Sequence, residues 1–437
     1  MKKQRKGEVM PNPNFSNFTS TLTRRQLLGI PITLTLTRMV KDSRAAERKR
    51  IAAVVTSYWY PSHAYCFVGA MTEGYPYYGE HRSPRVQVVS MYTDQVPDND
   101  MSRDVAAKHG ITIYPTIRET LMMEGKDLAV DGVLIVGEHG NYPINIKEQQ
   151  LYPRYYFYKQ VIDVFRETGR TVPVFCDKYF SHDWNEAKWI YDQSVAMGFP
   201  LMAGSSLPFA WRFPPLELDL ETPVEKALFA CYGGKERYGC HALEALQCMV
   251  ERREGGETGI AAVQCLEGSC VWEWTDTNPW AGRLLDHALA RCKERSKPGS
   301  PRKNVKRPIL FILEYRSGLQ AVVYILNGHM RDSAFAADLR GSDEPVSTQM
   351  YEQWVKPWGH GSGLYFYIEE MMINSRAYCS VERVLLTTGT LAALHDSSYQ
   401  NGRLLEKGRR LATPHLHIAY RAQKESLFNR GPVPPPE

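Results

Sequence analysis

The segment between Val172 and Gly204 restricts the fold more than any other part of the chain. Its first residues, Val172-Pro-Val-Phe-Cys176, have the apolar pattern of a short buried strand, and Asp177 and Lys178 follow directly. A helical pattern and a second apolar run come next. Strands that alternate with helices form a doubly wound sheet, and such a sheet binds its ligands outside the carboxyl ends of its strands. The sequence therefore predicts that Lys178 lies at a ligand site.

The same alternation extends over residues 50–210, and the pattern changes at about residue 211 to longer strands and hairpins. We expect an α/β fold in which residues 50–210 form a Rossmann-like domain with a doubly wound parallel sheet. Residues 211–425 are expected to form an α+β domain with an antiparallel sheet, in which 309–315 and 319–326 pair as a hairpin. The Pro-rich segment 426–437 is expected to be a solvated tail.

Basic residues are concentrated at the N-terminus. Residues 1–50 hold 12 Lys or Arg and only 3 Asp or Glu, so the remainder is net acidic although the whole chain carries +5. An acidic body disfavours nucleic acid as a partner. Arg24-Arg25, followed by an apolar run, resembles a twin-arginine export signal. We predict a leader at 1–49 and export to the periplasm, the alternative being a disordered basic tail on a cytoplasmic protein.

Two further patterns exclude classes of protein. No apolar run reaches the ~18 residues that a membrane-spanning helix needs, so no span is expected. The nine cysteines contain no Cys-x-x-Cys pair, which disfavours structural zinc. Buried free thiols are the expectation, and a disulfide stays open if the protein is exported.

Several motifs resemble the glucose-fructose oxidoreductase, inositol dehydrogenase and MocA family of NAD(P)-linked sugar and polyol oxidoreductases. Cys176-Asp-Lys-Tyr179 stands where that family has Glu-Lys-Pro, and Gly239-Cys-His-Ala-Leu-Glu244 is similar to its Gly-x-His-x-x-Asp element. The resemblance covers about residues 50–420. It implies NAD or NADP as cofactor, a carbohydrate-like small molecule as substrate, Lys178 and His241 as catalytic residues, and homo-oligomers formed through the antiparallel sheet.

The turn after the first strand departs from that family. A dinucleotide fold needs glycines here because only glycine lets the backbone approach the pyrophosphate, and residues 56–63 contain none. The hydroxyls of Ser57 and Ser62, with the helix start at His63, are the predicted phosphate ligands. Alternatively, the aromatic residues 58–60 fill the cofactor groove.

Further cofactor ligands are predicted from the ends of the strands. Asp94 follows the second strand and is a candidate for the ribose hydroxyls. The loop after Val136 is assigned by the resemblance to the nicotinamide ribose. The remaining cofactor-binding candidates are Gly137, Glu138, His139, Asn141 and Asp177.

Lys178 and His241 have catalytic and structural interpretations. A lysine amine near a carboxylate can have its pKa tuned and can serve as a proton donor or acceptor, whereas its structural alternative is an ion pair with Asp177 or Glu138. The imidazole of His241 titrates near neutrality and could take a proton from a substrate hydroxyl, whereas its alternative is a buried, satisfied histidine.

Three functions follow from these patterns. The first is an NAD(P)-dependent oxidoreductase of a sugar, polyol or derivative. The second is a non-redox saccharide-binding protein whose groove is blocked by residues 58–60. The third is a metal-dependent hydrolase or lyase that uses Glu138, His139, His182 and His241, although no metal site is favoured. A pair of metal ligands at His415 and His417 on one strand face is a weaker alternative to a plain sheet surface.

Overall fold

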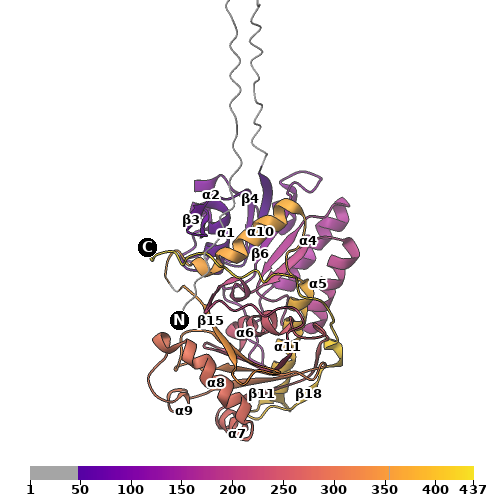
Figure 1. Ribbon diagram of the computed structural model, residues 1–437. Helices are drawn as coiled ribbons and strands as arrows, with labels where there is room; N and C mark the ends of the chain where they lie inside the picture. The colour runs from indigo at the N-terminus through magenta and orange to yellow at the C-terminus, as the bar shows by residue number, and fades with distance from the viewer. Residues whose placement is uncertain (1–47, 354) are drawn as a thin grey trace, which may run out of the picture. The chain divides into compact units, whose positions relative to one another are not determined.

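The computed structural model describes residues 48–353 and 355–437 (Figure 1). The predicted leader and its twin-arginine pattern lie outside the described residues, apart from the last two positions of 1–49. Among the described residues, no helix has the length and apolarity that crossing a membrane requires. All nine cysteines lie in this part of the chain and are free thiols.

The first sheet has six parallel strands, which confirms the predicted Rossmann-like sheet. In spatial order they are β5 (Thr112–Ile113), β4 (Val86–Thr93), β1 (Lys49–Val55), β6 (Gly132–Val136), β7 (Val174–Asp177) and β8 (Leu201–Gly204). The strand order reverses between β1 and β6. In open α/β sheets, ligands bind at such a switch point, outside the carboxyl ends of the strands.

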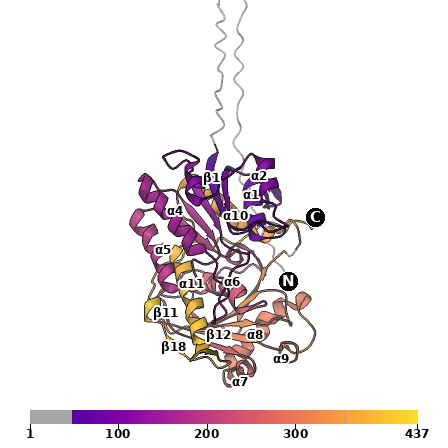
Figure 2. The ribbon, with the colours of Figure 1, turned by 180° about the vertical axis from the view of Figure 1, so that it is seen from behind.

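Helices cover both faces of this sheet because its strands are apolar on both sides. Alternate residues of β1 illustrate the division, since Ala52 and Val54 enter one core and Ile51 and Val55 enter the other. The first core also contains residues of α3 (Ile117–Met122), α4 (Arg154–Thr168) and α5 (Trp184–Met197). Figure 2, which shows the molecule from behind, labels α4 and α5. The second contains residues of α1 (His63–Thr72), α2 (Ser102–His109) and α10 (Ser362–Asn374).

The second sheet has eight strands and holds the predicted hairpin. In spatial order they are β18 (Leu411–Ala412), β11 (Ile260–Glu267), β12 (Ile309–Tyr315), β13 (Gln320–Ile325), β10 (Val224–Cys231), β14 (Ala334–Leu339), β15 (Val346–Tyr351) and β9 (Trp211–Phe213). Its pairs are antiparallel except β10 with β13, which are parallel. The sheet is therefore mixed rather than wholly antiparallel.

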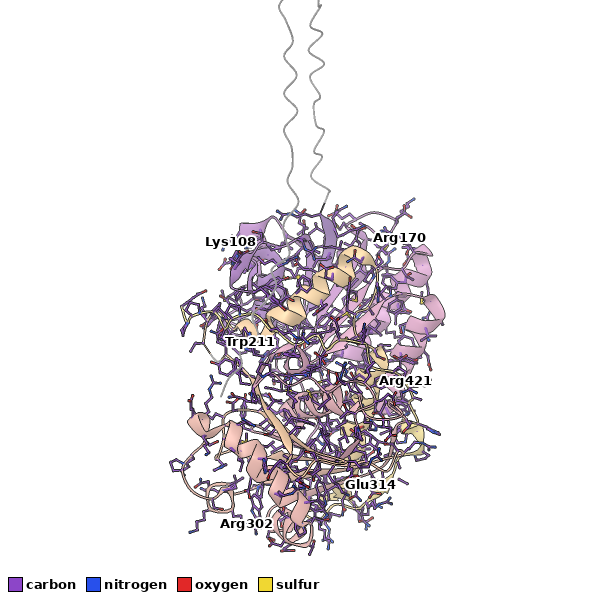
Figure 3. All side chains as sticks on the ribbon, viewed as in Figure 1. Lys108, Arg170, Trp211, Arg302, Glu314 and Arg421 are labelled. Atoms are coloured by element: carbon purple, nitrogen blue, oxygen red, sulfur yellow. The ribbon has the colours of Figure 1, made fainter. Side chains whose placement is uncertain are left out.

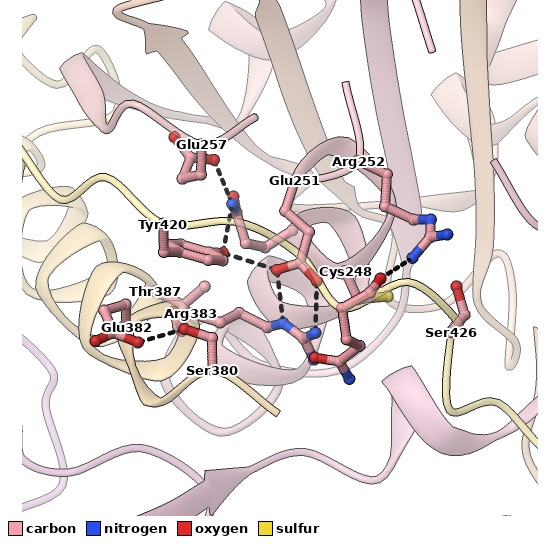
Figure 4. Close-up of polar contacts among 12 residues, drawn as sticks. Cys248, Glu251, Arg252, Glu257, Ser380, Glu382, Arg383, Thr387, Tyr420 and Ser426 are labelled. Carbon is pink, nitrogen blue, oxygen red and sulfur yellow. Dashed lines mark hydrogen bonds and ion pairs between the residues drawn. The ribbon is translucent and has the colours of Figure 1, made fainter. Parts of the chain in front are cut away.

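Two pairs of helices pack on opposite faces of the second sheet. One core contains residues of α6 (Lys235–Val250) and α11 (Val381–Ser397), and the other contains residues of α7 (Ser269–Thr277) and α8 (Pro279–Arg291). A buried ion pair joins α11 to the end of α6, because Arg383 donates to both carboxylate oxygens of Glu251, at 2.5 and 2.8 Å (Figure 4). The hydroxyl of Tyr420 donates to the same carboxylate at 2.8 Å.

The remaining elements are short. They are β2 (Tyr75–Tyr77), β3 (Glu80–Arg82), α9 (Pro301–Asn304), β16 (Tyr399–Gln400), β17 (Arg403–Leu404) and the 3-10 helices η1 (Leu207–Phe209), η2 (Lys293–Arg295), η3 (Gly359–Gly361) and η4 (Pro414–Leu416). His415 and His417 lie in and just after η4 rather than on one strand face, so the predicted strand is wrong there. The ring of His415 packs against that of Trp184, at 5.1 Å.

The division into domains stays a prediction, because residues 48–437 form one compact unit. α10 lies in the range expected for the second domain but packs on the first sheet (Figure 1). The C-terminal segment is also not simply solvated. The indole of Trp211 donates to the Gly431 carbonyl at 2.7 Å, and Gln353 donates to the Pro434 carbonyl at 2.7 Å.

Charged side chains on the molecular surface, such as Lys108, Arg170 and Arg421, point away from the hydrophobic cores (Figure 3). Ionisable groups that are buried therefore stand apart from the general pattern, since desolvating a charge is costly unless it is paired. Besides Arg383 and Glu251 between α11 and α6, one set of buried ionisable side chains lies at the carboxyl ends of β6 and β7.

Candidate active site

A cavity of about 230 Å³ lies between the carboxyl ends of the first sheet and the face of the second. The first sheet and α1 contribute Glu138, His139, Asp177, Lys178 and His63 to its wall. The second region contributes Arg237, Tyr238 and His241 from α6, with Ser333, Glu352 and His360. Lys178 and His241, which are 63 positions apart in the sequence, thus face the same space.

Lys178 belongs to a buried ionic triad. Its Nζ donates to Glu138 Oε1 at 2.8 Å, and Arg154 donates to Glu138 Oε2 at 2.6 Å. Burial alone would lower the pKa of Lys178, but the acidic groups around the amine, Glu138 first among them, together outweigh burial and hold that pKa above its ordinary value. Likewise, burial would raise the pKa of Glu138, and the two cations hold it well below its usual range. Lys178 is therefore a persistent cation at neutral pH rather than a base.

The backbone places this amine at the strand tip. Lys178 has φ of 62°, in the left-handed region that a lysine rarely occupies, and its N–H donates to the Gly204 carbonyl at 3.1 Å. Sparsely populated conformations of this kind persist where the surroundings determine them, often at functional sites. The side chain also donates to the Arg237 carbonyl, at 3.3 Å, which ties the first sheet to α6.

His241 is a neutral imidazole with a defined hydrogen bond. Its Nδ1 lies 2.6 Å from Ser205 Oγ, which accepts a second hydrogen bond from the Leu207 N–H at 3.1 Å. Burial, followed by the charge of Lys178, lowers the pKa of His241 well below its usual value. When Nδ1 carries the hydrogen and donates to Ser205, Nε2 keeps a lone pair that can accept a proton.

His63 and His139 form a second group beside Lys178. His63 Nδ1 lies 2.7 Å from Asp177 Oδ2, and the rings of His63 and His139 are 5.1 Å apart. Burial, followed by the charge of His63, lowers the pKa of His139 to about 4. Its Nε2 is buried with no hydrogen-bond partner within residues 48–353 and 355–437. A buried polar atom without a partner indicates a place for a polar ligand atom.

Of the second region's wall residues, His241 was predicted from the sequence, whereas Ser333, Glu352 and His360 were not. His360 donates from Nδ1 to the Gln353 carbonyl at 3.1 Å, which leaves Nε2 as an acceptor, and burial lowers its pKa to about 4. Glu352 accepts from Ser333 Oγ at 3.1 Å, and burial with the nearby Asp332 raises its pKa to about 7. Glu352 lies in irregular backbone and His360 in the single turn of η3, so the only local signal is the glycine on each side of His360.

Five of the predicted cofactor ligands do not line the cavity. These are Ser57, Ser62, Asp94, Gly137 and Asn141. A Cβ at Gly137 would stand 2.6 Å from the Arg154 side chain, so this glycine admits the buried arginine rather than a ligand. Asp94 accepts from the hydroxyls of Tyr92 and Tyr142, at 2.7 and 2.6 Å.

The turn at 56–62 is closed by the protein's own groups. Tyr58 is 1% exposed and belongs to the core, and the side chain of Ser62 accepts from the N–H groups of Trp59 and Tyr65 at 3.1 and 3.2 Å. Gln95 bonds both the N–H and the carbonyl of Asn141, at 2.8 and 3.1 Å, so two neighbouring loops brace each other. The Ser62 hydroxyl that was predicted to hold a phosphate instead caps α1.

A dinucleotide therefore fits this region in part. The cavity, with the free Nε2 of His139, suits the nicotinamide end. The closed turn does not suit the pyrophosphate as it stands, because no glycine opens the backbone and the cap is already satisfied.

The four metal ligands of the third hypothesis do not all lie together in the structure. Glu138, His139 and His241 line the cavity, whereas His182 lies in a different hollow near Trp184 and Asp396. Over the described part of the chain, no group of three or more His, Cys, Asp or Glu residues is arranged to hold a metal ion. Asp183, beside His182, caps α5 through the N–H groups of Asn185 and Glu186.

Comparison with known proteins identifies the fold. No protein-family model matches the chain, and no curated protein matches it. The solved structure of GenD2 from gentamicin A biosynthesis, in complex with NAD, has a TM-score of 0.53 at 14% identity, over 85% of this chain and 97% of that one. Myo-inositol dehydrogenase from Lactobacillus casei, in complex with NAD(H) and myo-inositol, has a TM-score of 0.51 at 10% identity, over 84% and 96%. The chain therefore has the two-region fold of these NAD-bound proteins, as its motifs predicted.

Proposed function

We propose that the protein is an NAD(P)-dependent oxidoreductase that acts on a sugar, a polyol or a derivative of one. One observation carries the proposal: Lys178 and His241 face one cavity at the carboxyl edge of a parallel sheet. Solved structures with this fold hold NAD in the case of GenD2 and NAD(H) with myo-inositol in the case of the Lactobacillus casei enzyme.

The two residues have different roles in this proposal. The Nε2 of His241 takes the proton of a substrate hydroxyl, since its imidazole is neutral and Ser205 orients it. The Lys178 ammonium stabilises the negative charge that develops on that oxygen, because Glu138 keeps it protonated and fixed in a largely dry site. Bound NAD(P) would supply the hydride acceptor, and His63, His139 and Asp177 are the residues that would hold its nicotinamide end.

Titration of the purified protein with NAD and with NADP, followed by melting temperature, tests the proposal. A ligand that binds the folded state alone stabilises it by about 2.7 kcal/mol at a hundredfold excess over Kd. We expect one nucleotide to raise the melting temperature and to be reduced in the presence of a polyol or sugar. His241→Gln should keep the thermal shift and lose the reduction. No shift with either nucleotide at saturating concentration would contradict the proposal.

The closed turn favours a second candidate, a non-redox saccharide-binding protein. Tyr58 occupies the core where a glycine-rich turn would leave space, and Ser62 already caps α1. This candidate gives the opposite outcome in the same titration, because saccharides would raise the melting temperature while both nucleotides leave it unchanged.

Export and self-association are also proposals. Arg24 and Arg25 would direct the folded protein through the twin-arginine route, and Arg24→Lys with Arg25→Lys should retain a fused reporter in the cytoplasm. Homo-oligomers would form through the second sheet, as the family resemblance implies, and sedimentation of the purified protein measures their size.

A further inference from the structure

We propose that the substrate is an anionic sugar derivative, whose carboxylate or phosphate group binds the guanidinium of Arg237. This inference rests on the cavity being the substrate site of the proposed function. Arg237 lines the cavity and is exposed. Within the described residues, no ion pair, hydrogen bond or ring contact engages its guanidinium, although its backbone carbonyl accepts from Lys178 at 3.3 Å.

An anion bound by Arg237 would lie beside the substrate hydroxyl that His241 and Lys178 contact. Arg237 and His241 are four residues apart on α6, so both side chains leave the same face of the helix with roughly 5–6 Å between their Cβ atoms. The Lys178 ammonium touches the Arg237 carbonyl. A ligand group bound by the guanidinium therefore lies only a few atoms from a hydroxyl that His241 and Lys178 contact.

Arg237 differs from its neighbours on the first turn of α6. Lys235 is buried and lies 2.9 Å from Glu267 and 3.0 Å from Glu148. Glu236 lies 2.9 Å from His395 and accepts from the hydroxyl of Tyr179. The protein thus pairs the two charges that precede Arg237 and, in the part of the chain that the structure describes, leaves the one that lines the cavity without a partner.

The carboxylates of the cavity wall bind other groups, and within the described residues none of them contacts the Arg237 guanidinium. Glu138 is bound by Lys178 and Arg154, and Asp177 lies 2.7 Å from His63. The Glu352 carboxyl accepts from Ser333. An external anion is the complement of this wall, and a guanidinium binds both carboxylate and phosphate through two parallel hydrogen bonds.

Binding of matched anionic and neutral sugars to the purified full-length protein tests this inference without any nucleotide. The probes are D-glucuronate, D-gluconate and D-glucose 6-phosphate, against D-glucose and myo-inositol, at one ionic strength. We expect at least one anionic probe to bind about tenfold or more tightly than its neutral counterpart. The carboxylate and phosphate arms identify which group the site takes.

Three variants separate a specific contact from general charge. Arg237→Gln should remove the preference, so that an anionic sugar and its neutral counterpart bind equally well, and Arg237→Lys should retain part of the preference. Arg316→Gln is the matched control, because Arg316 is exposed on the turn between β12 and β13 and does not line the cavity.

Equal binding of anionic and neutral probes, no binding of any anionic probe, or an Arg237→Gln variant that keeps the preference would overturn the inference. Failure of the proposed function has a different signature, since the anionic probes would bind while neither nucleotide does.

Discussion

Two parts of the same sheet edge have been built in different ways. At the ends of β6 and β7, ionisable side chains are buried yet face a cavity, as Lys178, Glu138 and Asp177 do. At the ends of β1 and β4, the loops satisfy one another, because the N–H groups of Gln95 and Met101 donate to the carbonyls of Thr56 and Tyr58, both at 2.8 Å, and Ser62 caps α1. The difference is that polar side chains at the first place face an open cavity, whereas at the second place packing fills the turn where a glycine-rich fold would bind a pyrophosphate.

Substitution of His241 should give the largest effect on the cavity side. His241→Gln removes the proton acceptor and should lower turnover by about 10²–10⁴-fold, the usual contribution of general base catalysis. The measurement is kcat with the best substrate and nucleotide. His182→Gln is the matched control, because His182 lies in a different hollow. Equal turnover of the two variants would show that the cavity histidine is structural.

Removing one carboxylate after β6 and one after β4 should lower the free energy of unfolding by different amounts. Glu138→Ala leaves Lys178 and Arg154 buried without their shared partner, which should lower the free energy of unfolding by about 3–5 kcal/mol. Asp94→Ala breaks two hydroxyl contacts at an exposed position and should cost about 1 kcal/mol or less. Urea unfolding of both variants measures the difference, and comparable losses would contradict the contrast.

Buried ionisable side chains at and near the cavity should also make the stability of the fold depend on pH. Burial raises the pKa of Glu244 from 4.5 to about 8, and its carboxyl accepts from the Ser205 N–H at 3.1 Å. Because the folded pKa exceeds the unfolded one, the folded state binds more protons, and this contribution to stability is lost as pH rises from 4.5 to about 8. His139 and His360 act oppositely, since their pKa values fall from 6.5 to about 4 and their contribution is lost as pH falls through that range.

Glu244→Gln tests this assignment, because an amide oxygen can accept the same hydrogen bond without titrating. Relative to the unsubstituted protein, the variant should gain stability on the order of 1–3 kcal/mol between about pH 5 and about pH 8.5. Urea unfolding at the two pH values measures it. A difference that does not change with pH would mean that Glu244 is ionised throughout.

Loosening the loop after β4 should have a smaller effect, which we expect on the affinity for the nucleotide. Gln95→Ala removes the side-chain contacts with Asn141 and should loosen the loop after β4. Because the N–H groups of Gln95 and Met101 in this loop donate to the carbonyls of Thr56 and Tyr58, the turn at 56–62 should then open more easily. If NAD(P) binds only when this turn opens, then its apparent affinity should increase severalfold, since affinity is reduced by the fraction of closed molecules. Isothermal titration with both nucleotides measures it. Unchanged or weaker binding would show that opening of the turn does not limit the affinity for the nucleotide.

Sequence patterns were sufficient for most of the fold and for one half of the cavity. The apolar runs before Val136 and Asp177 predicted buried parallel strands, and because such strands end at one edge, the polar residues after them had to converge. Ser62 and Asp183 were recognisable as helix caps from their residue type and position.

In the other half of the cavity, only His241 was indicated, by the family resemblance. Glu352 lies in irregular backbone and His360 in a single 3-10 turn, so neither carries a periodic signal, and only tertiary packing brings them opposite Lys178. The packing of α10 on the first sheet and the docking of the C-terminal segment against Trp211 are likewise long-range contacts. The missing glycines at 56–62 did indicate an unusual turn, but not which of its two interpretations holds.

A crystal structure of the protein soaked with NAD or NADP and a polyol tests the central claim most directly. The account predicts the nicotinamide ring in the cavity beside His63 and His139, with a substrate hydroxyl between Lys178 Nζ and His241 Nε2. A saccharide bound alone in the cavity, with Tyr58 still buried and no nucleotide along the closed turn, would contradict it.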